Sequence, residues 1–376
     1  MKYRRFGKTN LHLSVFSLGT MRYNSGQENA YQTIYQALNL GINHIETARG
    51  YGKSEEFLGI SLKSSLPQAR KDIYITTKIP PTPNAELMEQ YIYESLQRLQ
   101  LDYIDCLGIH GVNTWEHLQW VKKPDGCMLA VQKAKEKNLI RNVGFSTHGS
   151  QEIIRETINT DLFDFVNLHY YYFFQRHDPI IKLAEEKDLG VFIISPSDKG
   201  GKLYTPPQLL IDLCQPFSPL ELNYRFLLNN PHITTLSVGP AHAQELILPL
   251  SVADKDYPLT SEEKEVFKRL ESQLENSLNT DLCSQCYQCL PCPENINIPE
   301  VLRLRNLAIA YDMTDYGQYR YRMIENAGHW VPGKKANRCT DCGDCLPRCP
   351  QNLDIPKLLR DTHDRLNGAE RKRLWA

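Results

Sequence analysis

Short apolar runs rich in β-branched residues alternate with segments of helical periodicity along the first 280 residues of the chain. There are eight such runs, at residues 15–20, 44–48, 73–78, 103–110, 142–147, 165–171, 191–196 and 235–240. Runs of this length are typical of buried strands, and strands that alternate with helices are typical of a parallel sheet. Eight strands with helical connections predict an α/β fold of the closed (β/α)8, or TIM-barrel, type.

The segments outside the eight runs add detail to this prediction. Residues 84–99 predict a helix, because Asn84 suits an N-cap and the apolar residues after it follow a helical spacing. Residues 1–14 predict a small hairpin that closes the bottom of the barrel. A doubly wound open sheet is the alternative, but no G-x-G-x-x-G motif follows the first run.

Polar residues stand at the ends of consecutive predicted strands, where barrel enzymes place their chemistry. Glu46, Lys78 and His110 end the second, third and fourth runs, and Tyr51 lies in the loop after Glu46. A carbonyl reductase needs a proton donor, and a tyrosine with a pKa near 10 is a poor acid unless its anion is stabilised. A lysine cation supplies that stabilisation, a carboxylate holds the lysine, and a histidine hydrogen-bonds the substrate oxygen.

These residues belong to longer motifs, which are GINHIETARGYGKSE (41–55), ITTK (75–78), LGIH (107–110) and VGFS (143–146). In them the chain resembles the aldo/keto reductase family over roughly residues 1–278. The resemblance implies a small-molecule carbonyl substrate and NADP or NAD as cofactor. It also implies a catalytic tetrad of Tyr51, Lys78, His110 and Glu46, in which Tyr51 is the general acid. The family usually has Asp where Glu46 stands.

The resemblance also implies ten nucleotide contacts. These are Ser146, Thr147, Asn167, Ser195, Gly200, Gly201, Ser237, Gly239, His242 and Glu245. Asn167 is an amide suited to the nicotinamide carboxamide, and paired glycines let backbone N–H groups approach the pyrophosphate. Many relatives carry an arginine near the position of Glu245, and its absence here leaves the choice between NADP and NAD open.

Cysteine is concentrated at the end of the chain, where eight of the 11 cysteines follow residue 280. An internal repeat of the form C-P-x-N-[IL]-x-I-P-x-[LV]-L covers residues 292–302 and 349–359. Three further cysteines precede each copy, at intervals of three residues. The pattern predicts metal ligands rather than disulfides, because the chain shows no secretion signal.

The second copy has the C-x2-C-x2-C-x3-C-P spacing of bacterial ferredoxins, and the first is shorter by one residue. In two-cluster ferredoxins the cysteine before proline serves the other cluster. We therefore predict two 4Fe-4S clusters with crossed ligation. One is held by Cys283, Cys286, Cys289 and Cys349, and the other by Cys339, Cys342, Cys345 and Cys292. Structural zinc is the alternative, but it does not explain runs of four cysteines with a following proline.

The division of the chain follows from these patterns. We predict an aldo/keto reductase-like barrel at residues 1–278 and a small α-helical ferredoxin-like domain at residues 279–376. Acidic and basic residues number 44 and 43, so no overall charge favours a nucleic acid or an anionic membrane. No signal peptide or membrane span is recognisable, and we expect a cytoplasmic protein.

The leading functional hypothesis is NAD(P)H-linked carbonyl reduction by a barrel that carries two 4Fe-4S clusters for electron transfer. A second hypothesis is a cluster-driven one-electron reductase that takes electrons from a partner protein such as ferredoxin. A third is a redox-sensing or docking protein that binds the nucleotide as a signal.

Overall fold

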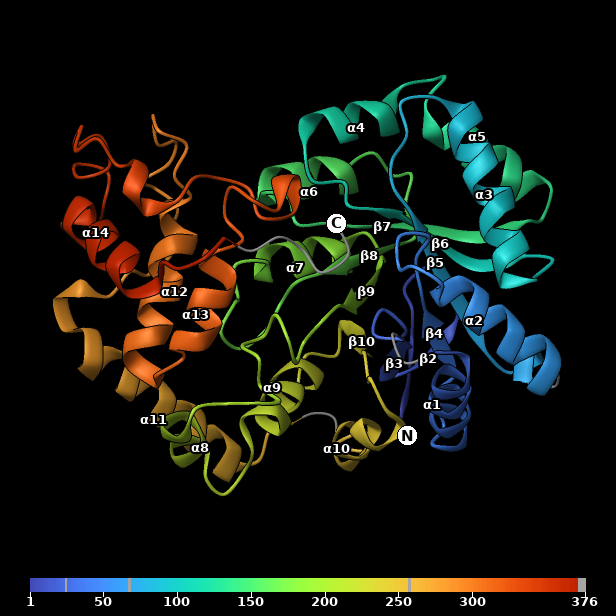
Figure 1. The fold of residues 1–376 in the computed structure, drawn as a ribbon, viewed down its shortest axis with the longest axis horizontal. Coiled ribbons are helices and arrows are strands. Elements are labelled where there is room, and N and C mark those ends of the chain that lie inside the picture. The colour runs from blue at the N-terminus through green and yellow to red at the C-terminus, as the bar shows by residue number, and fades with distance from the viewer. Residues whose placement is uncertain (24–25, 67–68, 256–257, 371–376) are drawn as a thin grey trace. The chain divides into compact units, whose positions relative to one another are not determined.

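The computed structural model describes residues 1–23, 26–66, 69–255 and 258–370 (Figure 1). The described chain forms two compact units. The first contains residues 1–200 and 223–258, and the second contains residues 201–222 and 259–370.

The first unit is built on a closed barrel of eight parallel strands (Figure 1). The strands are β3 (Phe16–Gly19), β4 (His44–Glu46), β5 (Tyr74–Ile79), β6 (Ile104–His110), β7 (Ile140–Ser146), β8 (Phe165–Leu168), β9 (Gly190–Ile193) and β10 (Ile233–Val238). Each strand pairs with the next in sequence, and β10 closes the ring by pairing with both β9 and β3. All eight lie within or overlap the predicted runs, and the predicted (β/α)8 barrel is confirmed.

Helices connect the strands in the expected alternation. They are α1 (Gln27–Asn39), α2 (Ser54–Ile60), α3 (Ala85–Leu99), α4 (Trp115–Lys122), α5 (Cys127–Glu136), α6 (Gln151–Ile158), α7 (Asp178–Glu186), α9 (Pro219–Leu228) and α10 (Ile247–Ser251). The side chain of Asn84 accepts a hydrogen bond of 3.0 Å from the backbone N–H of Leu87, which confirms the predicted N-cap of α3. The division between the two units falls within α9.

The N-terminal hairpin closes the barrel at the amino ends of the strands. Strands β1 (Tyr3–Arg5) and β2 (His12–Ser14) pair in antiparallel fashion. Phe6, in the turn between them, is fully buried against Phe165 and Phe192, at or near the starts of β8 and β9. A Cβ on Gly190 would lie 2.2 Å from the Phe6 ring, so only glycine leaves room for it. The predicted hairpin plug is therefore present.

The second unit is helical around a central buried helix (Figure 1). Its helices are α8 (Gln208–Cys214), α11 (Ser261–Leu278), α12 (Ile298–Tyr311), α13 (Thr314–Tyr321) and α14 (Ile355–Leu366). Nearly every residue of α12 is buried, and its two arginines form ion pairs, Arg303 with Glu300 and Arg305 with Asp361. Within the described ranges, no helix combines the length and apolar character needed to cross a membrane.

We expect Phe6→Ala to lower the free energy of unfolding of the barrel by about 3–5 kcal/mol, because the lost ring leaves a cavity in the barrel floor. Tyr35→Ala is the control, since Tyr35 is 44% exposed and its loss should cost at most about 0.5 kcal/mol. Urea unfolding followed by circular dichroism measures both. Equal stability of the two variants would show that the hairpin does not plug the barrel.

Candidate functional site

The four residues of the predicted tetrad come from three neighbouring strands. Glu46 is the last residue of β4, Lys78 is the penultimate residue of β5, and His110 ends β6. Tyr51 follows β4 in a loop that begins at the same end of the barrel. The carboxyl ends of parallel strands meet at one face of a barrel, so the fold itself brings these side chains together.

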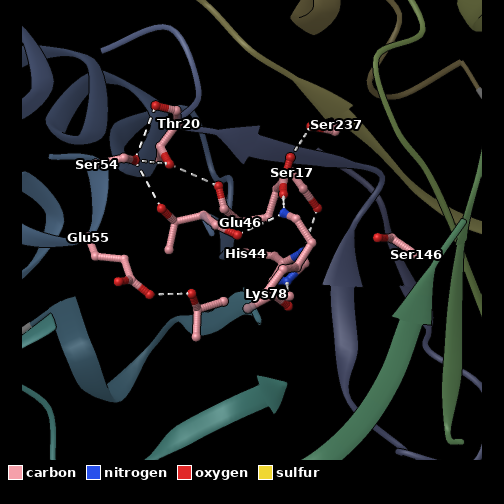
Figure 2. A network of polar contacts seen from close by, with 12 residues as sticks. Ser17, Thr20, His44, Glu46, Ser54, Glu55, Lys78, Ser146 and Ser237 are labelled. Carbon is pink, nitrogen blue, oxygen red and sulfur yellow. Dashed lines mark hydrogen bonds and ion pairs between the residues drawn. The ribbon is translucent and has the colours of Figure 1, made fainter. Parts of the chain in front are cut away.

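Lys78 and Glu46 form a buried ion pair in the barrel interior (Figure 2). The Lys78 ammonium contacts Glu46 Oε2 and also donates to the carbonyl oxygen of Thr47 at 2.7 Å. Gly108 on β6 makes room for the lysine stem, because a Cβ there would lie 2.9 Å from Lys78 Cγ. Glu46 thus contacts Lys78 directly, as its predicted role of orienting the lysine requires.

Tyr51 lies between the lysine and the histidine. Lys78 Nζ is 5.0 Å from the centroid of the Tyr51 ring. The Tyr51 and His110 rings meet edge to face, with centroids 5.7 Å apart. The structure therefore gathers all four predicted catalytic residues in one place, with Tyr51 and His110 partly exposed and the ion pair buried.

Burial alters the proton affinities around the pair. It lowers the pKa of Lys78 to about 7, because an ammonium loses its hydration in the barrel interior. It also lowers the pKa of His44 to about 3, with a further contribution from the charge of Lys78. His44 is therefore a neutral histidine whose ring nitrogens contact the Ser17 and Thr76 hydroxyls at 2.6 and 2.7 Å (Figure 2).

The predicted contacts to the nicotinamide carboxamide occupy β7, β8 and the residue after β7. Asn167 is fully buried, and both atoms of its side-chain amide lack a hydrogen-bond partner among the described residues. A buried amide normally has partners, so this group fits a ligand amide that would supply them. Ser146 Oγ accepts from the N–H of Gly111 at 3.0 Å and keeps its own hydrogen to donate. The Thr147 hydroxyl donates to the Val112 carbonyl at 2.7 Å and accepts from the Gly149 N–H at 2.9 Å.

The predicted pyrophosphate loop is divided between the two units. Ser195 has a left-handed backbone with φ of 54°, and a Cβ on Gly200 would lie 2.0 Å from the Pro196 carbonyl oxygen. In the second unit, Gly201 has φ of 139°, and a Cβ there would lie 2.6 Å from Met313 Cε. Local packing thus explains both glycines, and their contact with a nucleotide stays a prediction.

The segment after β10 holds the last four predicted nucleotide contacts. Ser237 lies inside the barrel, where its hydroxyl donates to Glu46 Oε1 at 2.8 Å. Glu245 accepts from the Ala241 N–H at 3.0 Å and pairs with Arg22 at 2.8 Å. Arg22, from the loop after β3, thus places a guanidinium beside Glu245.

His242 and Gly239 are the other two predicted nucleotide contacts in this segment. The ring of His242 contacts the side-chain oxygen of Asn29 at 3.3 Å. A Cβ on Gly239 would have only the Gly19 carbonyl oxygen within reach, at 3.8 Å. Their nucleotide contacts, and those of Ser237 and Glu245, stay predictions.

Sequence reasoning missed a cluster of side chains formed by His148, His169 and Lys199. The Nε2 atoms of His148 and His169 are 2.9 Å apart, and Lys199 Nζ lies 3.3 and 3.4 Å from them. His169 Nδ1 contacts the Tyr171 hydroxyl, which donates to the Ile194 carbonyl. Their positions in the sequence could have indicated this cluster. His148 and His169 each lie two residues after a predicted nucleotide contact, Ser146 or Asn167, near the ends of neighbouring strands.

In the second unit, cysteines of one copy of the repeat lie near cysteines of the other. A cleft is lined by Cys292 together with Cys339, Cys342 and Cys345, over buried Ile298 and Leu359. Burial raises the pKa of Cys345, and the charges of Cys339, Cys342 and Cys292 raise it further. This proximity is what the crossed assignment requires of the second cluster.

The first group shows the reciprocal arrangement. Burial raises the pKa of Cys283, and the charges of Cys286 and Cys349 add to the increase. Burial also raises the pKa of Cys289 to about 12, and the charges of Cys283, Cys286 and, from the second copy, Cys345 add to the increase. Cys349 of the second copy is therefore a neighbour of Cys283, and the crossed assignment of the eight ligands stays a prediction.

The two cysteine loops also share one backbone conformation. Left-handed residues stand two and four positions after the first cysteine of each copy, at Gln285 and Tyr287 and at Asp341 and Gly343. They recur three positions after the last cysteine, at Asn295 and Asn352. Alternating left-handed turns direct successive N–H groups to one side, which suits an anionic iron–sulfur cluster. The repeat in the sequence is thus a repeat in space.

Comparison with known proteins agrees with this geometry. Residues 16–205 match the model of the aldo/keto reductase family. The chain belongs to the aldo/keto reductase family. Residues 282–353 match a 4Fe-4S dicluster domain, which decides between iron–sulfur clusters and zinc in favour of clusters. This aldo/keto reductase is therefore an oxidoreductase with a C-terminal dicluster domain. The family match ends at residue 205, so the boundary at residues 278–279 stays a prediction.

Several curated relatives share part of the barrel. The uncharacterized oxidoreductase YqkF of Bacillus subtilis is 26% identical over 53% of this chain and 66% of its own length. L-galactose dehydrogenase of Arabidopsis thaliana is 32% identical over 39% of this chain and 48% of its own. Methylglyoxal reductase DkgA of Escherichia coli K12 is 33% identical over 40% of this chain and 54% of its own. The chain thus spans about half to two thirds of the length of these relatives.

Solved structures show the same fold. Aldo-keto reductase AKR11C1 from Bacillus halodurans, in its holo form, superposes with a TM-score of 0.61 at 24% identity. The superposition covers 72% of this chain and 96% of that protein. At this identity the likeness concerns the barrel fold alone.

We expect Cys349→Ala to remove the cluster of the first cysteine group and leave about half of the iron, because each copy lends its last cysteine to the other. Iron analysis and electron paramagnetic resonance after anaerobic purification measure the loss. Cys127→Ala, at a buried cysteine of the barrel, is the control and should keep all the iron.

Double variants identify which cluster is lost. Adding Cys286→Ala to Cys349→Ala should remove no further iron, whereas adding Cys342→Ala should remove nearly all of it. The reverse pattern would mean that each copy ligates its own cluster.

Proposed function

We propose that the barrel reduces a small carbonyl compound with NADPH or NADH, and that Tyr51 is the proton donor. The observation that supports this proposal is the convergence of Tyr51, Lys78, His110 and Glu46 at the carboxyl ends of β4, β5 and β6. Each residue type alone is common. Their joint geometry suits the reduction of a carbonyl group.

The roles follow from charge and position. Tyr51 must leave a phenolate when it donates its proton to the carbonyl oxygen, and Lys78, 5.0 Å from its ring, stabilises that anion. Glu46 holds the ammonium in place, and His110 hydrogen-bonds the carbonyl oxygen. A bound nicotinamide dinucleotide would supply the hydride, and the unpartnered amide of Asn167 would hold its carboxamide.

The family implies a carbonyl substrate, and methylglyoxal is a reasonable first compound to assay because DkgA carries it in its name. We further propose that the dicluster domain exchanges electrons with a separate protein such as ferredoxin. The match to a 4Fe-4S dicluster domain, together with the eight cysteines of the second unit, supports a role in single-electron transfer.

We expect Tyr51→Phe to lower kcat for carbonyl reduction by a factor of about a hundred or more, the usual scale of general acid catalysis. Nucleotide affinity should barely change, because the phenyl ring is retained. Steady-state kinetics with a panel of aldehydes and ketones, and nucleotide titration by fluorescence, measure the two effects. Tyr35→Phe, at an exposed position, is the control. Near-normal turnover by Tyr51→Phe would remove Tyr51 from the reaction.

The dicluster domain favours a second candidate function, in which electrons for the barrel substrate come from a partner protein rather than from a nucleotide. Reduced ferredoxin without nucleotide should then support carbonyl reduction in the wild type. The Cys286→Ala and Cys342→Ala double variant should lose this activity. Under our proposal, the same double variant keeps its nucleotide-driven turnover, and reduced ferredoxin alone gives none.

A further inference from the structure

Glu46 differs from the usual family aspartate by one methylene, and the structure shows where the additional length goes. One carboxylate oxygen, Oε2, contacts Lys78. The other, Oε1, accepts a hydrogen bond of 2.8 Å from the hydroxyl of Ser237. Because an ionised carboxylate only accepts hydrogen bonds, Ser237 is the donor in this contact.

This hydrogen bond spans two strands that are not neighbours. Ser237 is on β10 and Glu46 is on β4, and β3 lies between them in the barrel. The contact passes over Gly19 of β3, where a Cβ would lie 2.7 Å from Ser237 Oγ and 3.2 Å from Glu46 Oε1. A glycine on the intervening strand is thus a condition for the contact.

The hydrogen bond between Ser237 and Glu46 is energetically important because both residues are buried. Glu46 and Ser237 are each 5% exposed, and Lys78 is 1% exposed. A buried carboxylate oxygen without a donor is costly, and the carboxyl group then turns away or takes up a proton. In either case Lys78 would lose the fixed negative charge that holds its ammonium beside Tyr51.

We infer that Ser237 is a positioning residue, which holds the Glu46 carboxylate against Lys78 and so sustains Tyr51 as the general acid. This inference rests on the proposed carbonyl reduction. It differs from the role that the sequence predicts for Ser237, which is contact with the nucleotide. The two roles have separate signatures, since a nucleotide contact alters binding of the dinucleotide whereas a positioning contact alters kcat.

The first experiment compares two buried hydroxyls in the same half of the barrel. Ser237→Ala should lower kcat by roughly tenfold or more, the scale of a small misplacement of a catalytic group, and leave the Kd for NADPH and NADH unchanged. Ser17→Ala is the control, because Ser17 contacts His44 and Thr235 rather than Glu46. A fall in nucleotide affinity at unchanged kcat, or equal kcat in the two variants, would overturn the inference.

The second experiment uses Glu46→Asp, which is too short to hold Lys78 and Ser237 together. In the Glu46→Asp background, Ser237→Ala should change kcat by less than about twofold, because the coupled contact is already lost. A tenfold loss in both backgrounds would show that Ser237 acts independently of Glu46. This cycle also decides the matter if the Ser237→Ala variant alone is unstable.

A third measurement is independent of turnover. The pKa of Tyr51, read from the 13Cζ-tyrosine resonance that is missing in Tyr51→Phe, should rise in Ser237→Ala, because the Lys78 cation no longer stabilises the phenolate as well. Lys78 and His110 face Tyr51 directly, whereas Glu46 and His44 act on Lys78. Ser17→Ala corrects for changes at His44. If wild-type protein reduces no carbonyl compound, the proposed function fails, whereas an unchanged Tyr51 pKa overturns the role of Ser237.

Discussion

The buried ion pair between Lys78 and Glu46 is the interaction on which the catalytic face depends. Moving two charges into a barrel core carries a large desolvation cost, which close geometry and additional hydrogen bonds must offset. The Thr47 carbonyl and the Ser237 hydroxyl supply those bonds. TIM-barrel cores are usually filled with branched apolar side chains, but below this pair lies a layer of hydroxyls around neutral His44. The ion pair therefore lies in a locally polar part of the barrel interior.

The barrel floor is apolar, and it packs directly against His44. Phe6, Phe165 and Phe192 fill the floor beneath the strands that carry the predicted nucleotide contacts. Dense packing there fixes the strand positions. In the second unit the corresponding constraint is backbone conformation, since left-handed residues recur at matching positions in both cysteine loops. Helix α12 anchors one loop through Asn306, which donates to the Cys283 carbonyl at 3.0 Å.

The parts of the molecule that the sequence predicts are those determined by local pattern. Strand positions follow from apolar runs, and the tetrad follows because Glu46, Lys78 and His110 lie at or near strand ends. Contacts across the barrel depend instead on the register between strands, and no local sequence pattern predicts that register. The approach of Ser237 to Glu46, and of Arg22 to Glu245, therefore emerges only from the fold. The packing of α11 with α12 and α8 is of the same kind, because it depends on a partner surface distant in sequence.

The exchange of aspartate for glutamate at position 46 illustrates how such distant contacts act on chemistry. A longer carboxylate in an unchanged barrel would have one oxygen without a donor, so its presence requires a donor within reach and space for the contact. Ser237 provides the donor and Gly19 the space, on two strands other than that of Glu46. In the proposed reaction, the acidity of Tyr51 depends on Lys78, and the placement of Lys78 depends on Glu46. Through this chain of contacts, β10 on the far side of β3 would contribute to the proposed chemistry at Tyr51.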